Sequence, residues 1–540
     1  MRSVPVHLSP GLGSDVSLGA IRHPERIALA LLDGPAMSYL EMDRETNRIA
    51  NALLGSGLRP GDRVAIWMGN SLEYVCSYVA CLKAGLVIVQ INTRHTAREA
   101  DYQLDDSGAT ALLFDDGVAE RVQGLESSGQ LRILATAGAE RVLDARSFSE
   151  FVRQGRDAQV AQASEPDALA VIGYTSGTTG YPKGVELTHR SIRNLGITNA
   201  LSNRYALASR QVFGLSLSFT AATPAHILPH LYVGGTTLLT RSWDTERIVA
   251  AIDEERASFT ILPSPAITDF IATARGSSTR LPSLQSVLHS ASKAPAEHLR
   301  EFVDYFGPRL LEGWGMTENS GGLVTATTVE DFASPRPGVF SSAGRAVPGA
   351  VVQLADEDGD PLPHDGETVG QLLVRTGSLA RGYWQNPEAT AAAFADGWYR
   401  SGDMGTITPD GLVTVIDRRS DLIVSGGMNV YPSEIERVIA ELGEVREVVV
   451  VAGPHERWGQ TPVVFLSVRD GQELDVDAVL RYCRSNLAGY KIPTQIHFLD
   501  ALPLNASGKV QRQELRGRVE SDSRHRAHAL RDPARENVSG

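Results

Sequence analysis

The chain has 540 residues, of which 42% are hydrophobic and 21% are charged, which is typical of a globular protein with several domains. Its formal net charge of −13 at pH 7 argues against a nucleic-acid or anionic-membrane binder, because the overall field repels polyanions. Three cysteines exclude a disulfide scaffold or a cysteine-rich zinc module. No apolar stretch is long enough to span a membrane, and the N-terminal residues lack the apolar run typical of a secretory signal, so we expect a cytoplasmic protein.

Strand-like and helix-like segments alternate through the first half of the chain. Ser38 and Glu41 form a capping-box pattern that predicts a helix to residue 55 or 57. A strand at 64–68, a helix at 71–83 and a strand at 86–91 follow, and this order predicts a parallel sheet covered by helices. Further strands are predicted at 111–114, 168–172, 259–262 and 285–288.

The amino-acid composition changes in the second half of the chain. Residues 344–377 are rich in Val, Gly, Pro and Asp and predict antiparallel hairpins. The last part of the chain predicts a separate small α+β domain, with helices at 431–442, 475–487 and 510–515 and a strand at 445–451. We therefore divide the chain into a large domain (1–417), a polar hinge (418–421), a small domain (422–520) and a disordered tail (521–540).

The most informative motif is the run YTSGTTGYPKGV at 174–185, which begins where a predicted strand ends. Its glycines allow backbone N–H groups to approach an anion, and its hydroxyls and lysine add donors and a positive charge. The spacing is not that of a Walker A loop, because Lys183 is followed by Gly184 and not by Ser or Thr. The alternative is a plain polar surface loop. The candidate phosphate-binding residues are Thr175, Ser176, Gly177, Thr178, Thr179, Gly180 and Lys183.

This run resembles the signature loop of the adenylate-forming superfamily, which contains acyl- and aryl-CoA synthetases, peptide-synthetase adenylation domains and beetle luciferases. Further matching segments follow in the family's order, and the pattern is most similar to that of acyl-CoA synthetases. They are GWGMTE at 313–318, GWYRSGD at 397–403, DRRSD at 417–421 with SGGMNVYP at 425–432, and NASGKV at 505–510. The resemblance implies an α/β fold with parallel-rich αβα sheets, a small β-barrel-like part and a mobile C-terminal domain.

The resemblance also implies roles for individual residues. Glu318 would support Mg²⁺ on ATP, as suits a hard cation that takes one carboxylate and phosphate oxygens, and Thr317 would reach the α-phosphate. Gly313 and Trp314 would lie against adenine. The alternative for a lone glutamate such as Glu318 is a solvated surface charge.

Two further assignments concern the ribose and the reacting phosphate. The resemblance implies that Asp403 and Arg418 bind the ribose hydroxyls, whereas the alternative for Asp403 is a turn-forming aspartate. Lys509 would enter beside the α-phosphate and stabilise the charge that develops during adenylation. Its alternative is a solvated lysine at the start of a helix.

The sequence departs from the family pattern around the substrate pocket and at the hinge. Many relatives have an aromatic–His pair where this chain has Phe219 and Thr220, and small neutral residues where it has Ser292 and Lys293. Lys293 either points to solvent or binds an additional anionic group of the substrate. The hinge position that is commonly Lys or Asp is Ser420. Ala221 and Gly315 complete the candidate pocket.

Other chemistry-bearing residues suggest no second site. Cys76 and Cys81 lie among apolar residues of one predicted helix, so we expect core packing. His226 and His230 have helical spacing but no acidic neighbours of a metal site, so we expect them to pack or to line a pocket.

The sequence therefore predicts an ATP- and Mg²⁺-dependent enzyme that adenylates a carboxylic acid, with coenzyme A as the first choice of acceptor. One alternative passes the adenylate to an amine or a carrier protein, and its most unusual form adenylates nitrite, as ATP-dependent diazotases do. A non-catalytic nucleotide-binding module is disfavoured because Lys509, Glu318 and Asp403 are all present. A homodimer is left open.

Overall fold

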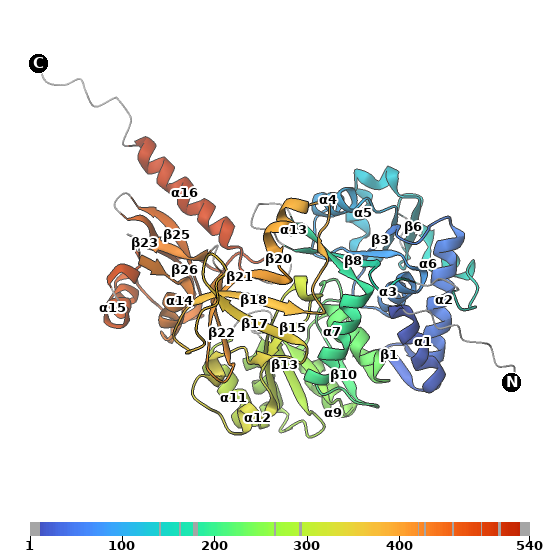
Figure 1. Cartoon of the computed structure of the whole chain (residues 1–540), viewed down its shortest axis with the longest axis horizontal. Helices are drawn as coiled ribbons and strands as arrows, with labels where there is room; N and C mark the ends of the chain where they lie inside the picture. Colours follow the sequence, from blue (N-terminus) through green and yellow to red (C-terminus); the bar gives the residue numbers. More distant parts are fainter. Residues whose placement is uncertain are drawn as a thin grey trace, which may run out of the picture.

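The computed structural model describes residues 11–139, 142–160, 164–175, 182–263, 266–290, 294–418, 421–425, 428–455, 458–487, 489–505 and 509–529. Within these ranges the chain forms four β-sheets with helices packed around them (Figure 1). The helices are α1 (Leu12–Arg22), α2 (Tyr39–Gly55), α3 (Leu72–Ala84), α4 (Ala97–Ser107), α5 (Ala119–Gln123), α6 (Phe148–Arg153), α7 (His189–Ser202), α8 (Leu228–Tyr232), α9 (Thr245–Glu254), α10 (Ile267–Gly276), α11 (Ala296–Phe306), α12 (Val329–Ala333), α13 (Pro387–Ala393), α14 (Pro432–Ala440), α15 (Val476–Asn486) and α16 (Arg512–Ala529).

The first large sheet is mainly parallel. Its order is β16-β15-β14-β13-β12-β10-β11-β1-β2, and only the outer pairs are antiparallel. The strands are β1 (Ile27–Leu31), β2 (Ala36–Ser38), β10 (Arg210–Phe213), β11 (Thr236–Leu239), β12 (Phe259–Leu262), β13 (Ser286–Ser290), β14 (Leu310–Gly315), β15 (Leu323–Ala326) and β16 (Arg345–Ala346).

The second large sheet has the order β19-β9-β8-β4-β3-β5-β6-β7. It is parallel from β8 to β7, and β9 and β19 add an antiparallel edge. The strands are β3 (Arg63–Trp67), β4 (Val87–Gln90), β5 (Ala111–Phe114), β6 (Ile133–Thr136), β7 (Arg146–Ser147), β8 (Leu169–Thr175), β9 (Lys183–Thr188) and β19 (Gly382–Tyr383).

Two smaller sheets follow in the chain. The third is antiparallel and contains β17 (Ala350–Ala355), β18 (Gly370–Thr376), β20 (Phe394–Ala395), β21 (Trp398–Ile407) and β22 (Val413–Arg418). The fourth belongs to the small domain, at one end of the molecule in Figure 1, and contains β23 (Ile423–Ser425), β24 (Met428–Val430), β25 (Val445–His455), β26 (Gly459–Val468) and β27 (Gln495–Phe498). These sheets confirm the predicted α/β fold class.

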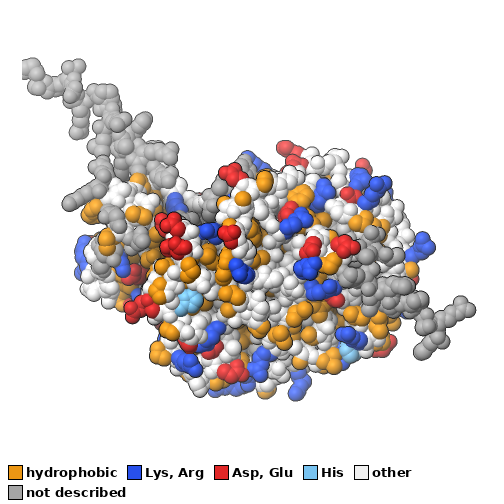
Figure 2. All heavy atoms as spheres, in the orientation of Figure 1, with side chains coloured by type: hydrophobic (Ala, Val, Ile, Leu, Met, Phe, Trp, Pro, Cys, Tyr) orange, Lys and Arg blue, Asp and Glu red, His pale blue; other side chains and the backbone are white. Residues whose placement is uncertain are grey.

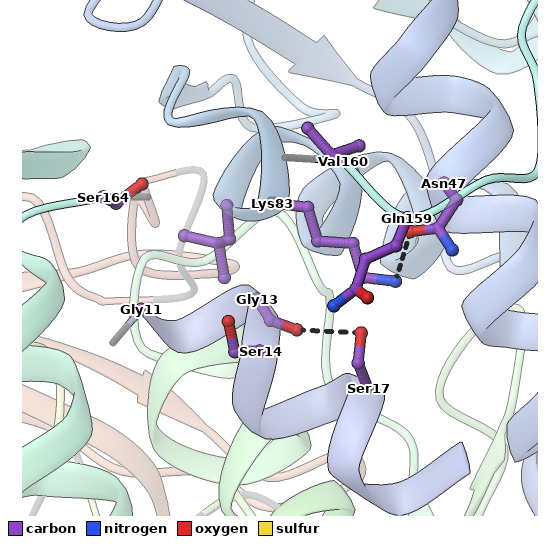
Figure 3. Close-up of a pocket in the computed structure, with 10 residues that line it drawn as sticks. Gly11, Gly13, Ser14, Ser17, Asn47, Lys83, Gln159, Val160 and Ser164 are labelled. Atoms are coloured by element: carbon purple, nitrogen blue, oxygen red, sulfur yellow. Dashed lines mark hydrogen bonds between the residues drawn. The ribbon is translucent and has the colours of Figure 1, made fainter. Parts of the chain in front are cut away.

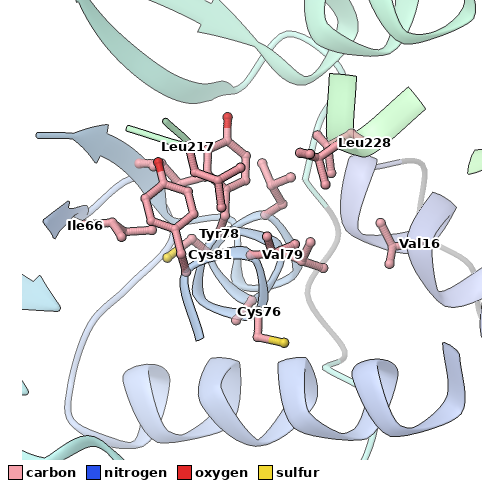
Figure 4. Close-up of a cluster of buried hydrophobic side chains, with 14 of the residues drawn as sticks. Val16, Ile66, Cys76, Tyr78, Val79, Cys81, Leu217 and Leu228 are labelled. Atoms are coloured by element: carbon pink, nitrogen blue, oxygen red, sulfur yellow. The ribbon is translucent and has the colours of Figure 1, made fainter. Parts of the chain in front are cut away.

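The helix α3 lies in the centre of the largest hydrophobic cluster (Figure 4). It begins after Ser71, whose hydroxyl accepts a hydrogen bond from the N–H of Tyr74, and it ends at Gly85 with a left-handed backbone. Cys76 and Cys81 are buried on it, as predicted, and burial raises the pKa of both thiols. They act as core side chains.

A buried lysine joins α3 to α2 (Figure 3). The Lys83 ammonium donates to Asp43 Oδ1 at 2.6 Å, Thr46 Oγ1 at 2.7 Å and Asn47 Oδ1 at 3.0 Å. Burial lowers the pKa of Lys83. Gly13 of α1 passes so close that a Cβ there would lie 2.7 Å from Lys83 Cα, so α1, α2 and α3 are fixed together.

Most predicted boundaries match within a few residues, and the capping box of Ser38 and Glu41 is present. The predicted disordered tail is wrong at its start, because α16 continues past Ser521 to Ala529. The buried Leu515 and Val519 anchor the helix against the small domain, and elongation of an existing helix is easy for such a sequence. In the described part of the chain, no helix combines the length and apolar character needed to cross a membrane.

Candidate active site

The predicted phosphate loop connects β8 to β9, where the second large sheet changes from parallel to antiparallel pairing. Thr175 and Lys183 are cross-strand partners at the base of this loop. The candidate residues Ser176, Gly177, Thr178, Thr179 and Gly180 lie outside the described residues. The loop therefore follows the carboxyl end of β8, where ligands bind in open α/β sheets.

Neighbouring side chains hold the base of the loop in place. The Tyr174 hydroxyl donates to Asp106 Oδ2 at 2.6 Å, and the Trp384 indole N–H donates to the backbone oxygen of Asp106 at 2.9 Å. Burial, followed by the contact with Asp106, raises the pKa of Tyr174. A Cβ at position 184 would lie 2.7 Å from Ile172, so Gly184 is required by packing.

Glu318 lies in the short 3-10 turn Thr317–Asn319 that follows β14. Its Oε1 accepts a hydrogen bond of 3.0 Å from the Tyr383 hydroxyl, and its backbone oxygen accepts one of 2.8 Å from the N–H of Ala380. Lys183 Nζ lies 5.5 Å from the centroid of the Tyr383 ring. The turn with Glu318 and the base of the phosphate loop therefore meet at Tyr383.

The structure also joins Trp314 to Asp403. The indole N–H donates to Asp403 Oδ2 at 2.8 Å, and both residues are more than nine-tenths buried. Arg418 stands directly opposite Asp403 in the β21–β22 ladder. Gly313 precedes Trp314 on β14, where a Cβ would lie 2.5 Å from Leu323. The candidate adenine and ribose residues thus lie side by side.

The candidate pocket residues pack between the end of β8 and the Glu318 turn. A Cβ on Gly173 would lie 2.3 Å from the Thr220 methyl, and a Cβ on Gly321 would lie 2.5 Å from Ala221 Cα. The backbone oxygen of Phe219 accepts a hydrogen bond from the side-chain Nε2 of Gln90 at 3.2 Å. A Cβ on Gly315 would collide with the backbone oxygen of Gly322. Ser292 and Lys293 lie outside the described residues.

Sequence reasoning missed a buried polar pair beside this region. His289 of β13 and Glu312 of β14 are cross-strand partners, with Nδ1 2.6 Å from Oε2. The only sequence signal for this pair was that each of the two predicted strands has a polar residue directly after its apolar residues. Tyr383 was missed as well, because its role depends on contacts that join distant parts of the chain.

Lys509 lies in a turn of the small domain. Its backbone N–H donates to Asn505 Oδ1 at 2.9 Å, and its backbone oxygen accepts from the N–H of Asn505 at 2.8 Å. Its side chain is exposed, whereas Glu318 and Asp403 belong to the large domain. Ser420, the predicted hinge residue, lies outside the described residues.

The chemistry of the site fits Mg²⁺ held mainly by nucleotide. Among the described residues, no group of three or more His, Cys, Asp or Glu could hold a metal ion. Mg²⁺ commonly takes one or two protein carboxylates together with substrate phosphates and water, so a single carboxylate such as Glu318 is chemically compatible with this mode of binding. His226 and His230 are buried, and burial lowers the pKa of both to about 3. They pack in the interior, as predicted.

Comparisons with known proteins agree with this geometry. The model of the AMP-binding enzyme family matches residues 19–384, and that of the AMP-binding enzyme C-terminal domain matches residues 434–509. The chain is 34% identical over 490 residues to a feruloyl-CoA synthase from Amycolatopsis, which covers 90% of this chain and 94% of that protein. It is 33% identical over 482 residues to a long-chain-fatty-acid–CoA ligase of Mycobacterium tuberculosis, and this alignment covers 89% of this chain and 92% of that protein.

Solved structures share the whole architecture. ATP-bound MatB from Rhodopseudomonas palustris superposes with a TM-score of 0.84 at 28% identity, over 93% of this chain and 98% of that one. The matched family models cover parts of both domains and include β8, β9 and β14 of the candidate site, whereas β21 and β22 lie between the two matched ranges. This chain therefore belongs to the AMP-binding enzyme family, the adenylate-forming ligases.

Proposed function

We propose that this enzyme converts a carboxylic acid, ATP and coenzyme A into an acyl- or aryl-CoA thioester, AMP and pyrophosphate. In the first step a carboxylate oxygen attacks the α-phosphorus and pyrophosphate leaves. In the second step the thiol sulfur attacks the carbonyl carbon of the adenylate and AMP leaves. The observation that carries the proposal is the convergence of the phosphate-loop base, Glu318 and the Trp314–Asp403 pair, together with relatives that are named CoA synthases and ligases.

The residues have separate roles in this scheme. Lys183 and the phosphate loop bind the leaving phosphates, and Glu318 holds Mg²⁺, which supplies positive charge to the phosphate oxygens. Asp403 and Arg418 bind the ribose, and Trp314 lies against adenine. These interactions orient ATP, so that the acid in the Phe219–Ala221 pocket approaches the α-phosphorus along a fixed line.

Lys509 completes the adenylation site when the small domain turns about Ser420. The ammonium then stabilises negative charge at the attacked phosphorus. A second orientation of the small domain opens a path for the coenzyme A thiol. In the present arrangement the N–H of Ser433 donates to Asp417 Oδ2 at 2.8 Å across the domain boundary, and such a turn would break this contact.

Pyrophosphate release from ATP tests the proposal. The assay takes aliphatic, aryl and dicarboxylic acids, each with and without coenzyme A, and nitrite with and without an aromatic amine. We expect a carboxylic acid to turn over only when coenzyme A is present. Turnover of nitrite, or turnover that needs an amine and ignores coenzyme A, would contradict the thioester assignment while leaving adenylation in place.

A further inference from the structure

The segment Ala380–Trp384 contacts both the β8–β9 hairpin, which contains the predicted phosphate loop, and the turn that carries Glu318. Its backbone pairs with β9, where Gly382 is opposite Glu186 and Tyr383 is opposite Val185. The N–H of Trp384 donates to the backbone oxygen of Gly184 at 2.7 Å, next to Lys183. At its other end, the N–H of Ala380 donates to the backbone oxygen of Glu318. Two parts of the candidate site, far apart in sequence, thus share one short strand.

Tyr383 is the side chain of this segment that touches both charged groups. Its hydroxyl donates to Glu318 Oε1 at 3.0 Å, and its ring lies 5.5 Å from Lys183 Nζ, within cation–π range. The ring also contacts Phe394 edge-on at 5.9 Å, and the N–H of Tyr383 donates to Thr390 Oγ1 at 2.9 Å. The tyrosine is therefore held by its own surroundings on α13 and β20, independently of the two charges.

We propose that Tyr383 is a positioning residue that aligns Glu318 for Mg²⁺ and Lys183 for the phosphates while keeping the two charges apart. The inference rests on the roles of Lys183 and Glu318 given under the proposed function. A direct lysine–glutamate ion pair would offset both charges, whereas a neutral phenol orients the carboxylate by one oxygen and the ammonium by the ring face. The hydroxyl and the ring thus serve different partners, and their contributions are separable.

The hydroxyl is tested with Tyr383→Phe, which keeps the ring. Because the variant loses a hydrogen bond to a charged group, we expect the Mg²⁺ concentration needed for half-maximal ATP binding and adenylation to increase about tenfold. The KM for ATP at saturating Mg²⁺ stays near the wild-type value, because the ring still faces Lys183. Tyr383→Leu removes both contacts, and the KM for ATP then rises as well.

Two controls separate positioning from general damage to the fold. Tyr102→Phe removes a hydroxyl of α4 that bonds to the loop between β8 and β9, since Tyr102 donates to the backbone oxygen of Pro182 at 3.0 Å. The Mg²⁺ requirement of this variant should match the wild type. In a Glu318→Gln background, Tyr383→Phe should add no further change to the Mg²⁺ dependence of ATP binding, measured by titration calorimetry without turnover.

The outcomes are distinct. An unchanged Mg²⁺ requirement in Tyr383→Phe, an equal change in Tyr102→Phe, or an additive effect in the Glu318→Gln background would each overturn the positioning role. Such results would leave the proposed function standing if the wild type still adenylates an acid. A wild-type enzyme that binds ATP without any dependence on Mg²⁺ would instead overturn the role of Glu318, and this inference with it.

Discussion

Single side chains of the site are held by contacts whose partners lie far away in sequence. Asp403 receives the Trp314 indole N–H on one carboxylate oxygen, in a region where both residues are buried. This bond fixes the carboxylate rotamer before a nucleotide arrives, which lowers the entropic cost of binding. It also links the candidate adenine side chain to the candidate ribose side chain.

Replacing Asp403 by Asn tests the ribose assignment. The amide oxygen can still accept from the Trp314 indole, but the negative charge and one acceptor are lost. We expect the Kd for ATP to increase about tenfold, with little change in the melting temperature. An unaltered Kd in titration calorimetry would show that Asp403 does not bind the ribose.

At the scale of elements, α1, α2 and α3 depend on one buried polar junction. Lys83 bonds to α2 through Asp43, Thr46 and Asn47, and the Ser17 hydroxyl of α1 also donates to Asp43 at 2.6 Å. Lys83, Asn47, Ser17 and Gly13 also line a small, partly open pocket of about 20 Å³ (Figure 3). A cavity of this size and polarity suits one bound water molecule.

Lys83→Met should decrease the free energy of unfolding by about 2–4 kcal/mol, because the substitution leaves Asp43, Thr46 and Asn47 without their common donor. Urea unfolding followed by circular dichroism measures the change. The double variant with Asp43→Asn should recover part of the loss, since no unpaired carboxylate remains. A stability equal to that of the wild type would mean that the junction contributes nothing.

The whole molecule combines a large domain, which we propose binds the nucleotide, with a small domain that carries Lys509. On the face shown in Figure 2, basic and acidic side chains are interspersed. Such a surface does not steer polyanions, in line with the net charge of −13. In the proposed function, the chemistry therefore depends on local charges such as Lys183 and Lys509.

Lys509→Ala should slow adenylate formation by about 100-fold or more, because the ammonium that stabilises the developing charge is lost. Its exposed side chain predicts an unchanged melting temperature. Pyrophosphate release in single turnovers measures the effect, and thioester formation from a supplied adenylate should continue. Arg518→Ala, which removes an exposed pair with Glu514 on α16, is the control and should keep the wild-type rate.

The buried histidines predict how stability depends on pH. Burial lowers the pKa of His230 from 6.5 to about 3, so the unfolded chain binds a proton below pH 6.5 that the native protein does not. The free energy of unfolding is therefore retained above pH 6.5 and decreases as the pH falls from there. Each buried histidine contributes a decrease of up to about 1.4 kcal/mol per pH unit.

His230→Asn should make this decrease shallower between pH 6.5 and pH 5, in melting curves recorded at several pH values. The amide can still bond to Ser209, whose hydroxyl lies 2.8 Å from His230 Nε2. A pH profile identical to that of the wild type would show that His230 does not contribute.

Local patterns were sufficient for much of the fold. The capping box at Ser38, the helix at 71–83 and the apolar strand at 111–114 depend on neighbouring residues, and the structure agrees with each. The helix α16 extends beyond its prediction because burial of Leu515 and Val519 in the small domain supplies the nucleus that the local sequence lacks.

By itself, the sequence determined the family and the order of the motifs, because motif residues have fixed spacing along the chain. Only the tertiary structure decided that Trp314 bonds to Asp403, that His289 pairs with Glu312, and that Tyr383 lies between Lys183 and Glu318. Each of these contacts joins strands or turns that are close in space but separated in sequence. Their geometry follows from packing, which no local pattern encodes.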